Sequence, residues 1–232
     1  MAMIDPASLE SIEAPAMHIP DGFVSGPVAG VGFVLAGVAI GFAVWRTNRT
    51  IGERFVPFMG VMAAFIFAAQ MMNFPVAGGT SGHMVGGALA AILLGPWAAM
   101  IAMTAVVGVQ ALVFQDGGLA ALGANVFNMS VVACLVGYVV YTAFIRFSHI
   151  APWVRYVAAF SAAWFAVELA AIACSIELAL SDTSPLTVAL PAMVGVHAAI
   201  GVGEGLITVA AVAFVTATRP DLLVAQVPVM ED

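Results

Sequence analysis

Two histidines stand at points where a very apolar chain becomes polar. His18 follows Met17 in the stretch APAMHIPDGF (residues 14–23), and His83 ends the glycine-rich stretch PVAGGTSGH (75–83). Neutral imidazole is a common ligand for nickel, cobalt, zinc and copper, and glycines let the backbone turn tightly beside a ligand. If the two stretches meet in space, they predict a transition-metal site. The alternative is that each histidine is only a polar anchor near a membrane surface.

The order Met-His points to a more specific arrangement. If Met17 were the chain terminus, its amine, the His18 amide nitrogen and the His18 imidazole could chelate one ion in fused rings. The His83 imidazole would complete a set of four nitrogens, which suits tetragonal Ni2+ and which Co2+ also accepts. Because the amine must lose its proton to bind, the affinity of such a site should rise with pH.

Other polar residues lie inside the apolar runs. His197 and Glu204 are seven positions apart and share a helical face, and Glu168 lies in the preceding run. Ionisable residues inside a membrane are costly and are functional candidates, although a His–Glu pair or a carboxyl–amide contact that holds helices together would explain them equally well. Amide side chains that could orient metal ligands or cap helix ends lie toward the ends of the runs: Gln70, Asn73, Gln110, Asn125 and Asn128.

Composition identifies the elements that must position these residues. The 232 residues are 63% hydrophobic and 8% charged, with a mean hydropathy of +1.10, which is more apolar than a soluble domain of this size can bury. Apolar runs of about 20 residues fit the bilayer. We therefore predict an all-α integral membrane protein, a bundle of about seven transmembrane helices. The predicted spans are 25–46, 55–73, 84–95, 96–114, 125–146, 153–177 and 188–217.

The third span is shorter than the hydrocarbon core of a bilayer, because 84–95 covers only about 18 Å as a helix. It must stop short, or pack against neighbours and a water-filled cavity. Gly95-Pro96 separates it from the fourth span, since proline disfavours helix in the residue before it. Repeated GxxxG spacings, such as Gly26 to Gly30 and Gly201 to Gly205, predict close helix packing.

Charge distribution predicts the orientation. The chain has no lysine, and with seven spans all six arginines fall on one side, which the positive-inside rule makes cytoplasmic. The N-terminus is then outside and the C-terminus cytoplasmic, and the external segments carry an acidic rim that would attract cations. The arginines are Arg46, Arg49, Arg54, Arg146, Arg155 and Arg219.

The sequence lacks the motifs of membrane enzymes. HExxH, GxSxG and a P-loop lysine pattern are absent, so neither a protease nor a built-in ATPase is predicted. Three functions remain open at this point: capture of a metal ion, binding or facilitated passage of a small organic solute without a metal site, and a structural or regulatory membrane subunit without a ligand.

Four ordered motifs resemble the CbiM/NikM family, the substrate-specific (S) components of energy-coupling factor (ECF) importers for cobalt and nickel. The resemblance extends from residue 17 to the last span. The motifs are MHIPDGF (17–23), GTSGHMVGGALAAILLGPWAA (79–99), VQALVFQDGGLAALGANVFNM (109–129) and VHAAIGVGEGLIT (196–208).

The resemblance implies a site for Co2+ or Ni2+, as transported substrate, on the external side of a seven-helix bundle. Met17 would contribute its amine, His18 its amide and imidazole, and His83 its imidazole. Supporting roles fall to Asn73, Asn125 and Asn128, and a possible coupling or helix-packing role to His197 and Glu204.

The implied partners are a small accessory membrane subunit (CbiN/NikN-like), a transmembrane coupling subunit (CbiQ/NikQ-like) and ATPase subunits (CbiO/NikO-like). The chain itself would then be no enzyme. Its surroundings would be the lipid bilayer, in the cytoplasmic membrane of a prokaryote, with no nucleic-acid partner.

The chain departs from the family pattern at residues 1–16, which precede the Met-His pair. We expect three parts: this extension, a CbiM/NikM-like membrane domain over 17–218, and a short cytoplasmic tail over 219–232. Three explanations of the extension stay open. Translation begins at Met17, or the extension is removed after Ala16, or it stays and water, Asp21 or Asp5 replaces the terminal amine.

Overall fold

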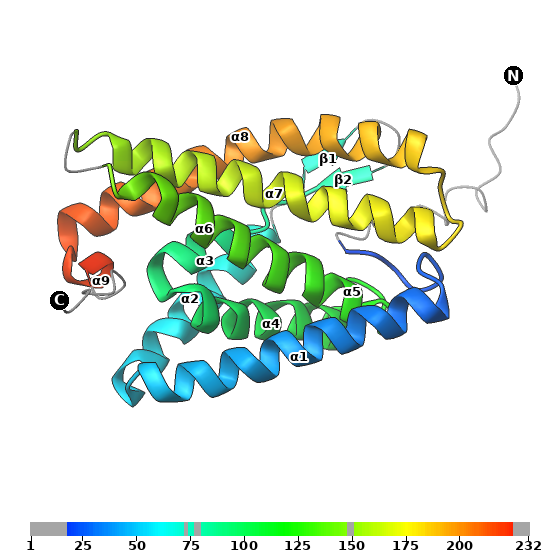
Figure 1. Cartoon of the computed structure of the whole chain (residues 1–232), viewed down its shortest axis with the longest axis horizontal. Coiled ribbons are helices and arrows are strands. Elements are labelled where there is room, and N and C mark those ends of the chain that lie inside the picture. The colour runs from blue at the N-terminus through cyan, green and yellow to red at the C-terminus, as the bar shows by residue number, and fades with distance from the viewer. Residues whose placement is uncertain (1–17, 72–73, 77–79, 148–150, 225–232) are drawn as a thin grey trace, which may run out of the picture.

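The computed structural model describes residues 18–71, 74–76, 80–147 and 151–224 of the chain. Helices dominate this part, and they run back and forth along one long axis (Figure 1). The main helices are α1 (Gly26–Thr50), α2 (Val56–Gln70), α3 (Gly87–Leu94), α4 (Pro96–Val113), α5 (Leu122–Val126), α6 (Ala133–Ile145), α7 (Val154–Leu180) and α8 (Leu186–Thr218). The short elements are η2 (Glu53–Phe55), β1 (Phe74–Val76), β2 (Thr80–Gly82), the π-helical η3 (Phe127–Val132) and α9 (Asp221–Val224).

These helices make the chain a multi-pass membrane protein. α5, η3 and α6 continue one another as a single helix over Leu122–Ile145, so all seven predicted spans correspond to helices in chain order. Five helices in the described residues are long and apolar enough to cross a bilayer, while α2 has 15 residues and α3 only eight. The helix-bundle prediction is confirmed.

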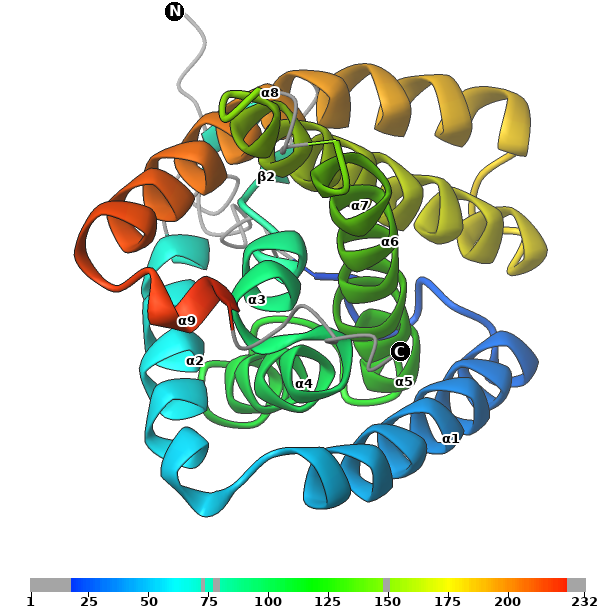
Figure 2. The same cartoon turned by 60° about the vertical axis from the view of Figure 1, so that its left-hand side comes forward.

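The short third helix lies at the centre of the bundle. All eight residues of α3 are buried, and Figure 2 shows the helix surrounded by its neighbours. It ends where Gly95, at φ +76°, turns the chain into α4, whose first residue is Pro96. The prediction of a short third helix is therefore confirmed, and of the second alternative the structure shows the packing against neighbours. An eight-residue helix can end inside the protein because other helices shield it from lipid.

Small residues let the helices approach closely. On α7, the buried face is made mostly of alanine. A Cβ atom added to Gly205 of α8 would lie 2.6 Å from the Phe160 ring of α7, so this GxxxG pair packs as predicted. Gly26 and Gly30 on α1 have nothing within 4 Å of such an atom among the described residues, so that spacing packs no helix within this part of the chain.

Sequence patterns missed two local features. β1 and β2 form an antiparallel hairpin that pairs Phe74 with Gly82 and Val76 with Thr80, ahead of the third helix. η3 inserts a π-helical stretch between α5 and α6, a feature that apolar periodicity does not reveal. α7 and α8 also extend beyond their predicted ends, to Leu180 and Thr218.

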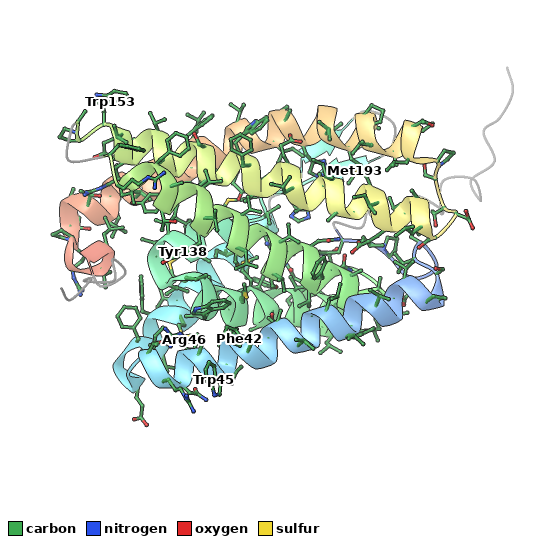
Figure 3. All side chains as sticks on the ribbon, viewed as in Figure 1. Phe42, Trp45, Arg46, Tyr138, Trp153 and Met193 are labelled. Atoms are coloured by element: carbon green, nitrogen blue, oxygen red, sulfur yellow. The ribbon has the colours of Figure 1, made fainter. Side chains whose placement is uncertain are left out.

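The start of α1 and the arginine-bearing segments lie at opposite ends of the bundle. At one end, the chain entering α1 meets the α7–α8 turn, where the Ser25 amide donates to Ser181 Oγ at 3.0 Å and Thr183 Oγ1 donates to the Phe23 carbonyl at 2.5 Å. The opposite end holds the last turn of α1, the start of α7 and the end of α8. Figure 3 shows Arg46 and Trp153 toward that opposite end. The arginine-bearing segments therefore lie together at the end away from the start of α1.

Candidate metal site

His18 lies in a short segment that starts in the interior and reaches the surface at Asp21, before α1 begins. The residue is only 5% exposed. Asn125 of α5 binds both backbone groups of Ile19, the residue after His18. The Ile19 amide donates to Asn125 Oδ1, and Asn125 Nδ2 donates to the Ile19 carbonyl, each at 3.0 Å. The Gly118 amide donates to the same carbonyl at 2.9 Å. The backbone beside His18 is thus fixed by partners about a hundred residues away in the sequence.

The loop between α4 and α5 forms the other wall around His18. Gln115 and Gly117 both have left-handed backbone, with φ of +56° and +94°. A Cβ atom at Gly117 would lie 2.7 Å from His18 Cβ, so only glycine leaves room for the imidazole. Asp21 Oδ1 accepts the Ala120 amide at 2.8 Å, which fastens the N-terminal segment over this loop.

His83 meets His18 from a different part of the chain. It follows β2, and its ring Nδ1 lies 2.9 Å from the Met84 carbonyl oxygen. The two imidazole centroids are 5.1 Å apart and the rings are tilted by 46°. With metal–nitrogen bonds of about 2.0 Å, two imidazoles on one ion have centroids about 4.5 Å apart when adjacent and about 6.4 Å when opposite. The observed separation falls between these limits, so the two rings are close enough to share one ion.

An acidic side chain adjoins the same imidazole. Asp116 Oδ2 lies 3.2 Å from His18 Nδ1, which is within ion-pair distance, although the two atoms do not have hydrogen-bond geometry. The carboxylate is therefore an electrostatic neighbour that favours positive charge at the site. Asp116 belongs to the acidic rim expected from the sequence, but nothing in the sequence places it beside His18. The turn sequence Gln-Asp-Gly-Gly was the available signal.

Three buried polar side chains hold the segment that follows His83. Glu204 of α8 accepts the amides of Val85 and Gly86, at 2.6 and 2.9 Å. Gln70 of α2 donates to the Val85 carbonyl at 2.6 Å, and Gln110 of α4 donates to Gln70 Oε1 at 2.8 Å. Helix capping, considered for the glutamines from sequence, does not describe these contacts, because they join helices through the loop.

The remaining predicted residues lie elsewhere or outside the described chain. Asn128 donates to Glu177 Oε2 of α7 at 2.7 Å. The His197 ring contacts the Met193 carbonyl of its own helix at 2.7 Å, so the alternative of a His197–Glu204 pair is wrong. The other alternative, a carboxyl–amide contact, describes Glu204, whose carboxylate accepts the Val85 and Gly86 amides. Met17, Asn73 and residues 1–16 lie outside the described residues, and the supporting roles of the asparagines stay predictions.

Side chains alone do not supply a complete metal shell in the described ranges. No three His, Cys, Asp or Glu side chains converge there as a group that could hold an ion. Two imidazoles leave coordination positions that backbone or terminal nitrogens would have to fill. This donor set, built from imidazoles rather than carboxylates, suits Ni2+ or Co2+ better than Mg2+ or Ca2+.

Known proteins that resemble this chain are membrane proteins of metal transport. The family model CbiM, described as the cobalt uptake substrate-specific transmembrane region, matches residues 18–222. A putative fused nickel transport protein NikMN of Archaeoglobus fulgidus is 46% identical over 209 residues, which cover 89% of this chain and 68% of the relative. A putative metal transport protein of Haloquadratum walsbyi is 45% identical over 212 residues, covering 90% and 94%.

A solved structure shares the fold. The crystal structure of a truncated transition metal transporter superimposes with a TM-score of 0.78 at 34% identity, covering 87% of this chain and 99% of that one. The fold and the matched sequence define a multi-pass protein of the metal-transport class. The chain belongs to the CbiM family.

Proposed function

We propose that this chain is the S component of an ATP-driven ECF importer, which captures Co2+ or Ni2+ on the external side of the membrane. The family match and the relatives' names support a role in cobalt or nickel transport. The observation that carries the proposal is the approach of His18 and His83 to a centroid distance of 5.1 Å in the interior of the bundle. The metal is cargo, so the chain needs a site that binds it reversibly.

In the proposed site, His18 supplies its imidazole and its amide nitrogen, and His83 supplies its imidazole. The amide and imidazole nitrogens of one histidine form a chelate ring around the ion, which fixes two positions with one residue. Met17 supplies the fourth nitrogen if its amine is the chain terminus. Asn125 supports this arrangement because its side chain binds both backbone groups of Ile19, beside the chelating residue.

The gathering of the arginine-bearing segments at one end of the bundle supports an external site at the other end. His18 lies in the segment leading into α1, at the end opposite the arginine-bearing segments. The positive-inside rule makes the arginine end cytoplasmic. The proposed orientation therefore has the N-terminus outside and the C-terminal tail inside, with Asp21 and Asp116 on the side from which a cation arrives.

The proposed partners are an accessory membrane subunit and the subunits that couple transport to ATP hydrolysis. The name of the fused NikMN relative joins this module to a second one, and this chain spans 68% of that relative. A NikN-like accessory subunit is therefore the first expected partner. ATP hydrolysis is assigned to CbiO/NikO-like ATPase subunits that act through a CbiQ/NikQ-like coupling subunit.

Metal titration of the purified full-length chain tests the proposal. We expect His18→Ala and His83→Ala each to weaken Ni2+ or Co2+ binding by at least 100-fold, because each removes a ligand. His197→Ala is a matched control, since it removes an imidazole whose ring bonds within α8. Unchanged affinity in His83→Ala would refute the metal site. Intact mass and N-terminal sequencing of the same sample establish whether the Met17 amine is available.

A further inference from the structure

The segment that carries His83 is held by a buried carboxylate. Glu204 is 2% exposed, and its two oxygens accept the backbone amides of Val85 and Gly86, which are 119 and 118 residues away. Each oxygen has its own donor, at 2.6 and 2.9 Å. Hydrogen bonds to an ionised acceptor are shorter and stronger than neutral ones. The carboxylate also faces the N-terminal end of α3, where negative charge is stabilised.

The same segment is held from the opposite side. Gln70 and Gln110 are both fully buried and are linked by hydrogen bonds: Gln110 donates to Gln70, and Gln70 donates to the Val85 carbonyl. Both backbone groups of Val85 are therefore bound by side chains, its amide by α8 and its carbonyl by α2. Gly86, at φ +80°, lies so close to Ile66 that an added Cβ would be 2.6 Å from Ile66 Cγ2. The segment has little freedom to move.

The position of His83 follows from these contacts. Val85 is two residues after His83, and the His83 ring itself lies against the Met84 carbonyl between them. A shift of the Val85 backbone would therefore move both the main chain and the ring contact of His83. Metal sites need their ligands held within about 0.5 Å of the productive geometry.

We propose that Glu204 is a positioning residue of the metal site, which acts through Val85 and Gly86 to hold His83 opposite His18. This inference rests on the proposed function. Since Glu204 belongs to α8, the hydrogen bonds also make the position of α8 a determinant of metal affinity. A movement of α8 that breaks them would loosen one of the two imidazoles and favour release of the ion.

The test compares Ni2+ binding by the full-length chain in a Glu204→Gln variant. The amide keeps one acceptor but places an N–H2 group against a backbone amide, so we expect a roughly 10-fold weaker affinity. The Ni2+ absorption spectrum should shift toward that of His83→Ala. Thr208→Val is the matched control, because Thr208 is buried one turn further along α8 and its hydroxyl has no hydrogen-bond partner in the described chain. It should leave affinity and spectrum unchanged.

A double-mutant cycle separates positioning from general stability. If Glu204 acts through His83, Glu204→Gln should change the affinity of the His83→Ala protein less than twofold. An equal loss in both backgrounds, or wild-type affinity in Glu204→Gln, would overturn the inference. If Glu204→Gln does not fold, Gln70→Leu tests whether the hold on Val85 positions His83, because it removes the bond to the Val85 carbonyl. We expect weaker binding, and wild-type affinity in that variant would overturn the inference. Unchanged affinity in His83→Ala, by contrast, would refute the proposed function itself.

Discussion

Gly117 offers the sharpest test of how the loop between α4 and α5 positions His18. Alanine at this position has two costs. The first is backbone strain at φ +94°, about 1–2 kcal/mol for a residue with a Cβ. The second is contact, because the new Cβ would lie 2.7 Å from His18 Cβ, whereas carbon atoms pack at about 3.5–4.0 Å.

Gly22 separates these two costs. Its φ is +87°, and an added Cβ there has nothing within 4 Å among the described residues. Gly22→Ala should therefore lose only the strain energy, while Gly117→Ala also pushes His18 by about 1 Å. Because a ligand displaced by that distance no longer meets the ion at bonding length, we expect Gly117→Ala to weaken Ni2+ affinity by about 10- to 100-fold. Gly22→Ala should change it less than threefold.

The assay is Ni2+ titration of both purified variants beside the wild-type chain, with thermal unfolding of the metal-free proteins measured in parallel. We expect both variants to unfold at lower temperature and only Gly117→Ala to lose affinity strongly. Equal affinity in the two variants would refute the reasoning, since it would mean that the loop does not set the position of His18.

Three further outcomes are expected. Asn125→Ala should weaken metal binding about 10-fold or more, because the buried Ile19 amide loses its acceptor at a cost of about 1–3 kcal/mol. The Ile19 carbonyl keeps the Gly118 amide as a donor. Unchanged affinity in a metal titration would mean that this contact is irrelevant to the site. Metal affinity should fall as pH is lowered, because protons compete for the ligand nitrogens; a flat profile from titrations across pH 5–8 would argue against imidazole ligands. Gly205→Ala should lower the free energy of unfolding by about 1–3 kcal/mol, because the added methyl group meets the Phe160 ring of α7. Gly203→Ala is the control and should be neutral or stabilising, because its methyl group meets nothing within 4 Å in the described chain. Equal melting temperatures of the two variants would contradict this packing.

The proposed site depends on contacts between distant segments rather than on one rigid motif. The segment of His18 is fixed by Asn125 and by the loop around Gly117, and the segment of His83 by Glu204 and Gln70. Helices α2, α4, α5 and α8 therefore all contribute to the distance between two imidazoles. A rearrangement of any of them would therefore change the affinity of the proposed site for the ion.

Local sequence properties were sufficient to predict the class of protein and the order of its helices. Apolar runs of bilayer length determine spans whatever their neighbours are, because lipid rewards apolar surface and requires internal hydrogen bonds. The short third helix was also predictable, since Gly95-Pro96 is a local break. The histidines at 18 and 83, with glycines around His83, were enough to suggest a metal site.

Only the tertiary structure decided which polar side chains meet. Helical spacing places His197 and Glu204 on one face of α8, yet Glu204 binds Val85 and Gly86, and His197 bonds within its own helix. Periodicity specifies which face of a helix a residue lies on. The partner of that residue also depends on how the helix is rotated about its axis and how far it is shifted along its neighbour, which periodicity does not specify. Those variables are set by close contacts such as Gly205 against Phe160, which no single segment contains.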